Sequence, residues 1–146
     1  MWEDIVKEKR IADHLYYVSL KYTKTCDVIL NLISRWISLI DKCVDSILEK
    51  LKKKKIIESI PIAPFQKITV IKEKMKRNKE VLEILELYMF FKRIRNLKYS
   101  KEQEFRKGVA LVVSEDEEKI KIDLEKLKEL NEKIEKFLIF IKEYIK

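Results

Sequence analysis

The chain of 146 residues contains one glycine, Gly108, and this scarcity restricts its fold more than any other feature. β-Hairpin turns and bulges rely on glycine, and phosphate-binding loops need several glycines in close succession. A Rossmann or P-loop nucleotide site therefore cannot be built around Gly108 alone. We expect an all-α fold, an antiparallel bundle of four to five helices with two long helices, forming one domain over residues 1–146.

The composition favours a folded helical protein over a disordered one. Hydrophobic residues make up 47% of the chain and charged residues 40%, which is enough for a core and for solvated helix faces. Arg35, Asp41 and Lys142 interrupt the apolar segments, so no membrane span is expected. The first residues do not resemble a signal peptide, and the abundance of Lys, Glu and Ile is typical of hyperthermophilic proteins.

Two cysteines, Cys26 and Cys43, are expected to stay unpaired. Their 17-residue spacing within one predicted helix separates them by roughly 25 Å, too far for a disulfide. We therefore expect reduced thiols in a cytoplasmic protein.

Apolar residues recur three or four positions apart from Leu15 to Leu51, with neither Gly nor Pro between them. This spacing predicts one helix over about residues 4–55. Such a helix is roughly 75 Å long, longer than a compact domain of this size is wide, so a kink or a partner is implied. We place the kink between Ser19 and Thr25, where hydroxyl groups can bond back to the backbone.

The apolar stripe of this helix is wide around Trp36, Ile37 and Ile40, which predicts contacts on two sides. Core packing accounts for part of it, and a homodimer accounts for the remainder.

The connections and later helices are marked by their end signals. A lysine-rich run at residues 50–55 ends the first helix, and Pro61 and Pro64 mark a connector. A short helix is expected over about residues 66–76, and Asn78 is expected to cap the next one.

Two capping-box patterns follow, at residues 100–103 and 114–117. The first predicts a short helix and the second a long helix over about residues 115–145. Residues 109–113 favour a strand by propensity alone. We favour a helix there, because no other strand is expected to pair with it.

Positive charge is concentrated in the middle of the chain. Residues 1–58 carry a net charge of +3, residues 59–114 carry +7 and residues 115–146 carry −2. Basic residues around an interleaved aromatic ring are typical of a phosphate-binding surface, although a solvated helix face has the same composition. The predicted nucleic-acid-binding residues are Lys92, Arg93, Arg95, Lys98, Tyr99, Arg106 and Lys107, with Lys101 beside them.

His14 is the only side chain expected to titrate near neutrality without special help. On a helix it shares one face with Arg10, Tyr17 and Lys21, with Asp13 beside them. His14 and Arg10 are the candidates for catalysis, and an exposed flank or a dimer seam explains the same face. One His and two Cys do not make a zinc site, no Glu-x-x-His pair is present, and no cofactor is predicted.

Three segments carry a resemblance to a known family. They read ADHLYYVSLKYTKT at residues 12–25, LYMFFKRIR at residues 87–95, and YS followed by EFR within residues 99–106. They are similar to archaeal helical proteins related to the HEPN superfamily, over roughly residues 5–113. The resemblance implies a dimeric bundle of four or five helices, related to RNA-cleaving toxins or to partners of small nucleotidyltransferases.

The ribonuclease motif of that superfamily, an Arg followed after four to six residues by a His, does not occur in this chain. Only three residues separate Arg10 from His14, and no His follows Arg95 or Arg106. The imidazole that would move a proton is therefore missing.

The expected function is that of a non-catalytic, dimeric binding or partner module that contacts RNA through the basic patch. A nucleotidyltransferase is a possible protein partner. The alternatives are a purely structural helical adaptor and an unconventional ribonuclease that uses His14. A peripheral membrane role through the lysines of residues 50–55 and the adjacent Ile56 and Ile57 ranks last.

Overall fold

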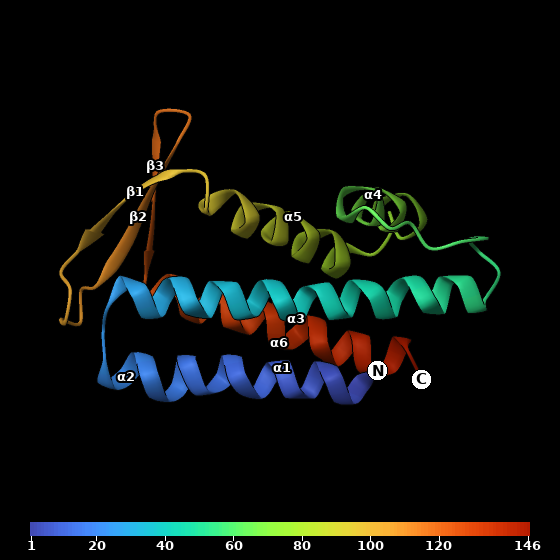
Figure 1. The fold of residues 1–146 in the computed structure, drawn as a ribbon, viewed down its shortest axis with the longest axis horizontal. Helices are drawn as coiled ribbons and strands as arrows, with labels where there is room; N and C mark the ends of the chain where they lie inside the picture. Colours follow the sequence, from blue (N-terminus) through green and yellow to red (C-terminus); the bar gives the residue numbers. More distant parts are fainter.

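The computed structural model describes residues 1–146 and combines helices with a three-stranded antiparallel sheet (Figure 1). The expectation of an all-α bundle is therefore wrong, although helices do form most of the chain. The helical elements are α1 (Trp2–His14), the π-helical turn η1 (Leu15–Ser19), α2 (Leu20–Tyr22), α3 (Cys26–Lys53), α4 (Pro64–Lys74), α5 (Lys79–Ile94) and α6 (Leu124–Tyr144); the strands are β1 (Lys98–Glu102), β2 (Ala110–Glu115) and β3 (Glu118–Asp123).

The single helix predicted for residues 4–55 is instead a helical hairpin. The chain reverses at Thr23 and Thr25, whose backbones are extended, and α3 then runs antiparallel to α1 (Figure 1). The side chain of Thr25 caps α3 by accepting a hydrogen bond of 3.3 Å from the N–H of Val28. The predicted break is thus in the right place, but it is a reversal rather than a kink.

Helix α3 is the centre of the fold. It packs against α1, α4, α5, α6 and β2, so apolar side chains around much of its circumference are buried. Trp36 stacks on Phe91 of α5, with ring centroids 5.8 Å apart. The wide apolar stripe seen in the sequence is thus largely covered within one chain.

Helices α4 and α5 begin close to where their sequence signals predict. Pro64 occupies the first turn of α4, where its missing N–H costs nothing. Asn78 caps α5 as predicted, and its Oδ1 accepts a hydrogen bond of 3.0 Å from the N–H of Val81.

The two capping boxes predicted at residues 100–103 and 114–117 do not start helices. The first lies largely in β1, and residues 110–113 of the segment for which we favoured a helix form part of β2. Strands β1 and β2 pair with Ser100 opposite Val112, and β2 pairs with β3 with Val112 opposite Lys121. We favoured a helix because we expected no strand to pair with this segment. That expectation was wrong, because β1 and β3 pair with β2 on its two sides.

A two-residue turn without glycine joins β2 to β3. Asp116 and Glu117 have φ angles of 50° and 68°, so both adopt the left-handed conformation that tight hairpins need. Helix α6 therefore begins at Leu124 rather than near residue 115. Its N-cap is Asp123, whose Oδ1 accepts a hydrogen bond of 2.8 Å from the N–H of Lys126.

Cys26 and Cys43 both lie in α3, buried and free, as the spacing predicted. None of the helices combines the length and apolar character that a membrane span requires.

The buried Cys43 thiol provides a test of this core. Burial raises the pKa of Cys43 from its ordinary value of 9.0 to about 12. A raised pKa in the folded state stabilises the fold below pH 9, and this contribution is lost as the pH rises from about 9 towards 12. We expect urea unfolding to show a loss of stability over this range that is smaller in Cys43→Ala than in the wild type.

Thiol labelling is the matching control. Because the thiolate is the reactive form, native Cys43 should react with a thiol reagent at pH 8 only as the protein unfolds. Rapid labelling of Cys43 in the native protein would contradict its burial in α3.

Candidate nucleic-acid interface

The structure distributes the predicted basic patch over three elements. Lys92 and Arg93 lie in the last turn of α5 and Arg95 caps that helix, while Lys98 and Tyr99 belong to β1. The remaining predicted residues, Arg106 and Lys107, lie in the loop between β1 and β2.

Two cations of this region are paired with carboxylates. Arg93 Nε donates to Glu115 Oε2 at 2.7 Å and a terminal nitrogen donates to Oε1 at 3.3 Å, and this contact raises the pKa of Arg93. Lys101 Nζ lies 3.1 Å from Asp27 Oδ1. Residues 92–123, which include the predicted patch and the sheet, contain nine basic and seven acidic residues, a net charge of only +2.

Positive charge accumulates instead at the opposite end of the molecule. Residues 50–79 contain eleven basic and two acidic residues, a net charge of +9, whereas the chain as a whole carries +8. All residues outside this segment therefore sum to −1. We call residues 50–79, together with Lys142 and Lys146 of the adjoining α6 end, the cationic end.

Most of this charge is not neutralised by side-chain carboxylates. Lys67, Lys72, Lys74 and Lys79 each have a carboxylate within 4.0 Å. The other basic residues of segment 50–79 have no acidic side chain at that distance; they are Lys50, Lys52, Lys53, Lys54, Lys55, Lys76 and Arg77. From the sequence we interpreted the lysine run as a helix-end signal and as a last-ranked membrane contact, and its combination with residues 72–79 was missed.

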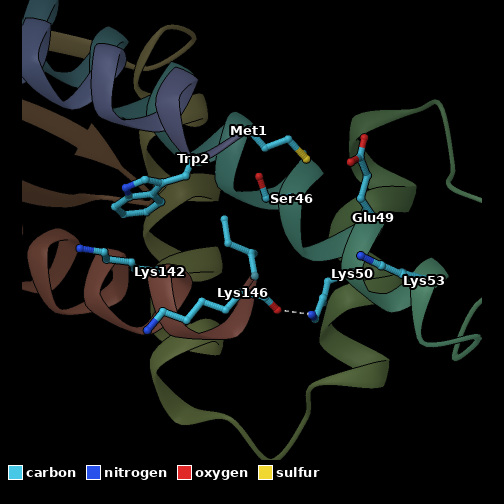
Figure 2. A pocket seen from close by; sticks show the side chains of 9 residues that line it. Met1, Trp2, Ser46, Glu49, Lys50, Lys53, Lys142 and Lys146 are labelled. Carbon is cyan, nitrogen blue, oxygen red and sulfur yellow. Dashed lines mark hydrogen bonds between the residues drawn. The ribbon is translucent and has the colours of Figure 1, made fainter.

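A hollow of about 480 Å³ opens between the end of α3, the end of α6 and the start of α1 (Figure 2). Lys50, Lys53 and Lys142 line it together with Trp2, and the Lys142 ammonium lies 6.0 Å from the centroid of the Trp2 ring. Glu49 is the one acidic residue of the lining. The hollow thus combines several cations with one partly buried aromatic ring.

A second hollow, of about 500 Å³, lies between the end of α3, the α4–α5 connection and the end of α6. Lys74, Lys76 and Arg77 line it on one side and Tyr144 on another, with Lys54 Nζ 4.9 Å from the Tyr144 ring centroid. Each hollow of the cationic end therefore pairs lysines with an aromatic side chain.

Apolar side chains are also exposed at the cationic end. In the connector after α3 and the first turn of α4, Ile62 is 93% exposed and Phe65 is 69% exposed, and Ile56 is exposed as well. These residues stand close in sequence to the lysines of residues 52–55.

Arg10 and His14 line a separate, shallow depression of about 350 Å³ between α1 and α3. Asn31 and Arg35 of α3 also line it, and no local sequence pattern connects them with His14. Tyr17, which was expected on the same face, turns towards α6 instead. The π-helical turn η1 explains the difference, because its extra residue per turn rotates the side chains that follow.

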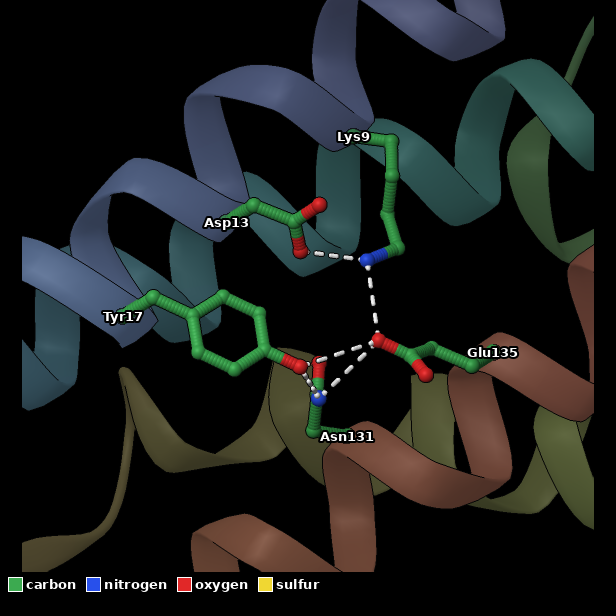
Figure 3. A network of polar contacts seen from close by, with 5 residues as sticks. All are labelled: Lys9, Asp13, Tyr17, Asn131 and Glu135. Atoms are coloured by element: carbon green, nitrogen blue, oxygen red, sulfur yellow. Dashed lines mark hydrogen bonds and ion pairs between the residues drawn. The ribbon is translucent and has the colours of Figure 1, made fainter.

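Tyr17 belongs to a polar network that joins α1 and η1 to α6 (Figure 3). Glu135 Oε1 accepts hydrogen bonds from Tyr17 at 3.2 Å, from Asn131 Nδ2 at 3.2 Å and from Lys9 at 3.3 Å. Lys9 also pairs with Asp13, and Asn131 is only 4% exposed. The network fixes the register of α1 on α6 and leaves His14 outside it.

No group of three or more His, Cys, Asp and Glu side chains is placed to hold a metal ion. Comparisons of the chain with protein-family models, with curated proteins and with solved structures found no match. The resemblance to the HEPN superfamily therefore stays a prediction from its sequence segments.

Replacing Glu135 should weaken the packing of α1 and η1 on α6 and so reduce the stability of the fold. Glu135→Ala removes the acceptor shared by three donors, one of them on the buried Asn131, so we expect unfolding free energy to fall by about 1–3 kcal/mol. Glu143→Ala on the same helix removes only an exposed pair with Lys146, and should change stability by less than about 0.5 kcal/mol. Urea unfolding measures both, and equal losses would contradict a structural role for the network.

Proposed function

We propose that the protein is a non-catalytic binding module for single-stranded RNA and that its cationic end contacts the phosphates. The observation that carries this proposal is the separation of charge: residues 50–79 hold +9 and the rest of the chain −1. A phosphate backbone binds such a surface by releasing condensed counterions, and the contact requires no base sequence.

The first hollow supports a single strand rather than a duplex. Single-stranded nucleic acid is held by cationic grooves in which bases stack on aromatic rings. Trp2 supplies such a ring, and a base that stacks on it takes the place of the Lys142 ammonium. The Tyr144 ring of the second hollow is already stacked on Phe140 and covered by Lys54, so that hollow contributes its cations only. A flexible strand can place a base at Trp2 and run its phosphates past Lys53 towards Lys76 and Arg77.

The patch predicted from the sequence has a smaller part in this proposal. Arg93 and Lys101 are paired with Glu115 and Asp27, and residues 92–123 carry a net charge of only +2. Arg106 and Lys107, in the β1–β2 loop, have no carboxylate partner and remain candidates for a secondary contact.

An anionic lipid surface is the second candidate, and one observation favours it. Ile62 and Phe65 are largely exposed near the lysine run, as expected of a loop that inserts into a bilayer surface. A structural adaptor role and a nucleotidyltransferase partner stay predictions.

Charge reversal at the first hollow should weaken RNA binding. For Lys53→Glu combined with Lys142→Glu we expect at least about a tenfold loss of affinity for a fluorescein-labelled oligouridylate, and a salt dependence shallower by about one unit of slope per lost phosphate contact. Fluorescence anisotropy at about 50 and 200 mM salt measures both quantities.

The matched control is Lys128→Glu combined with Lys133→Glu on α6, which makes the same change in net charge at exposed positions outside both hollows. An equal loss in the control would attribute binding to net charge alone. A larger loss in Arg106→Glu with Lys107→Glu would move the interface to the β1–β2 loop. Binding to phosphatidylserine vesicles but not to RNA, lost in Ile62→Ser with Phe65→Ser, would favour the lipid surface.

The proposal also predicts that bound RNA stays intact. His14 and Arg10 lie in the α1–α3 depression, outside the residues that line both hollows. We expect no cleavage of a labelled RNA beyond the buffer control, and RNA affinity unchanged in His14→Ala. Cleavage that the wild type performs and His14→Ala does not would overturn the non-catalytic function and favour the ribonuclease alternative.

A further inference from the structure

Strand β1 forms an open edge of the sheet. The strand order is β1-β2-β3, and β2 is the only element against which β1 packs extensively. All five residues of β1 are exposed, and the sheet lies at the end of the molecule away from the two chain termini (Figure 1). The backbone N–H and C=O groups on the outer side of β1 therefore have no strand partner within the chain.

The sequence of this edge, Lys-Tyr-Ser-Lys-Glu at residues 98–102, is complementary to itself when it is read against a second copy in the opposite direction. We propose that two copies of this chain associate by antiparallel pairing of their β1 strands, centred on Ser100. Lys98 of each copy then lies opposite Glu102 of the other, and the two Ser100 residues lie opposite each other. Tyr99 lies opposite Lys101.

Each of these pairs is favourable across an antiparallel ladder. Lys98 and Glu102 lie on the same face of β1, so a two-fold axis through Ser100 forms two ion pairs of opposite charge on that face. Tyr99 and Lys101 lie on the other face, where the Tyr99 ring of each copy packs on the aliphatic stem of a Lys101 whose ammonium group is paired with Asp27. Every second residue of an edge strand directs its backbone N–H and C=O outward. In this register those groups hydrogen-bond with the equivalent groups of the other copy, whether they belong to Lys98, Ser100 and Glu102 or to Tyr99 and Lys101.

The same side chains disfavour other registers. A shift of two residues in one direction places Lys101 opposite its own counterpart, and the opposite shift removes Glu102 from Lys98. Lysine on an edge strand commonly prevents pairing with another chain. A second copy in the centred register overcomes this, because it places Glu102 opposite Lys98, while Lys101 is paired with Asp27 of its own chain. We therefore infer a homodimer rather than a foreign peptide.

This association does not depend on RNA binding. The β1 edge and the cationic end lie at opposite ends of α3, which is about 42 Å long at 1.5 Å per residue over its 28 residues. Because a pairing of two five-residue strands buries little area, the dimer belongs to the weak class of interfaces, and its formation depends on concentration.

The experiment is sedimentation equilibrium of the full chain over a range of concentrations, with two charge-reversal variants. In Lys98→Glu both facing pairs become acid against acid, and in Glu102→Lys both become base against base. We expect the wild type to dimerise and the dimerisation affinity of each variant to fall by at least about tenfold. A mixture of the two variants restores opposite charges in both pairs, so it should form a heterodimer with an affinity close to that of the wild type.

The combined variant Lys98→Glu with Glu102→Lys exchanges the two charges and should also dimerise. Because all substituted positions are exposed, circular dichroism should show the wild-type fold in each variant. A wild type that stays monomeric at every concentration would overturn the proposal. A dimer that is insensitive to both single variants, or single variants whose mixture fails to associate, would overturn it equally, because pairing would then use another surface.

Discussion

The burial of α3 is the constraint on which the rest of the structure depends. A helix with apolar residues around much of its circumference needs partners on several sides, and a chain of this length can supply them only by folding back repeatedly. Helices α1, α5 and α6 and strand β2 provide those partners. The two ends of α3 then define two separate surfaces, the sheet at its start and the cationic end at its finish (Figure 1).

The helices that could be predicted are those whose ends carry local signals. Asn78 caps α5 and Pro64 opens α4, and both effects act within a single turn. The reversal before Cys26 has a weaker signal, since threonines occur inside helices as well as at their ends. It is held by long-range contacts: the N–H of Phe105 donates to the carbonyl of Lys24 at 2.7 Å, and the N–H of Cys26 donates to Glu104 Oε2 at 3.1 Å.

The sheet could not be found by the same reasoning. The β2–β3 turn places Asp116 and Glu117 in the left-handed region, at a cost of roughly 1–2 kcal/mol for each residue that is not glycine. Pairing of β2 with strands on both sides offsets this cost, and such pairing is invisible in a local pattern. Scarcity of glycine therefore does not exclude a tight hairpin, because Asp116 and Glu117 form one without it.

The candidate interface was missed in two parts. The charge of +9 on residues 50–79 is present in the sequence, but counting over residues 1–58 and 59–114 divided it. Only tertiary structure brings the lysines at the end of α3 beside residues 74–77 and the end of α6. Like charges gathered in this way repel one another and reduce stability. The negative ends of the α3 and α6 dipoles offset part of that repulsion. A polyanion that binds the folded chain would offset more of it and stabilise the fold by mass action. Charge separation of this kind is therefore consistent with a surface that is occupied by phosphates when the protein acts.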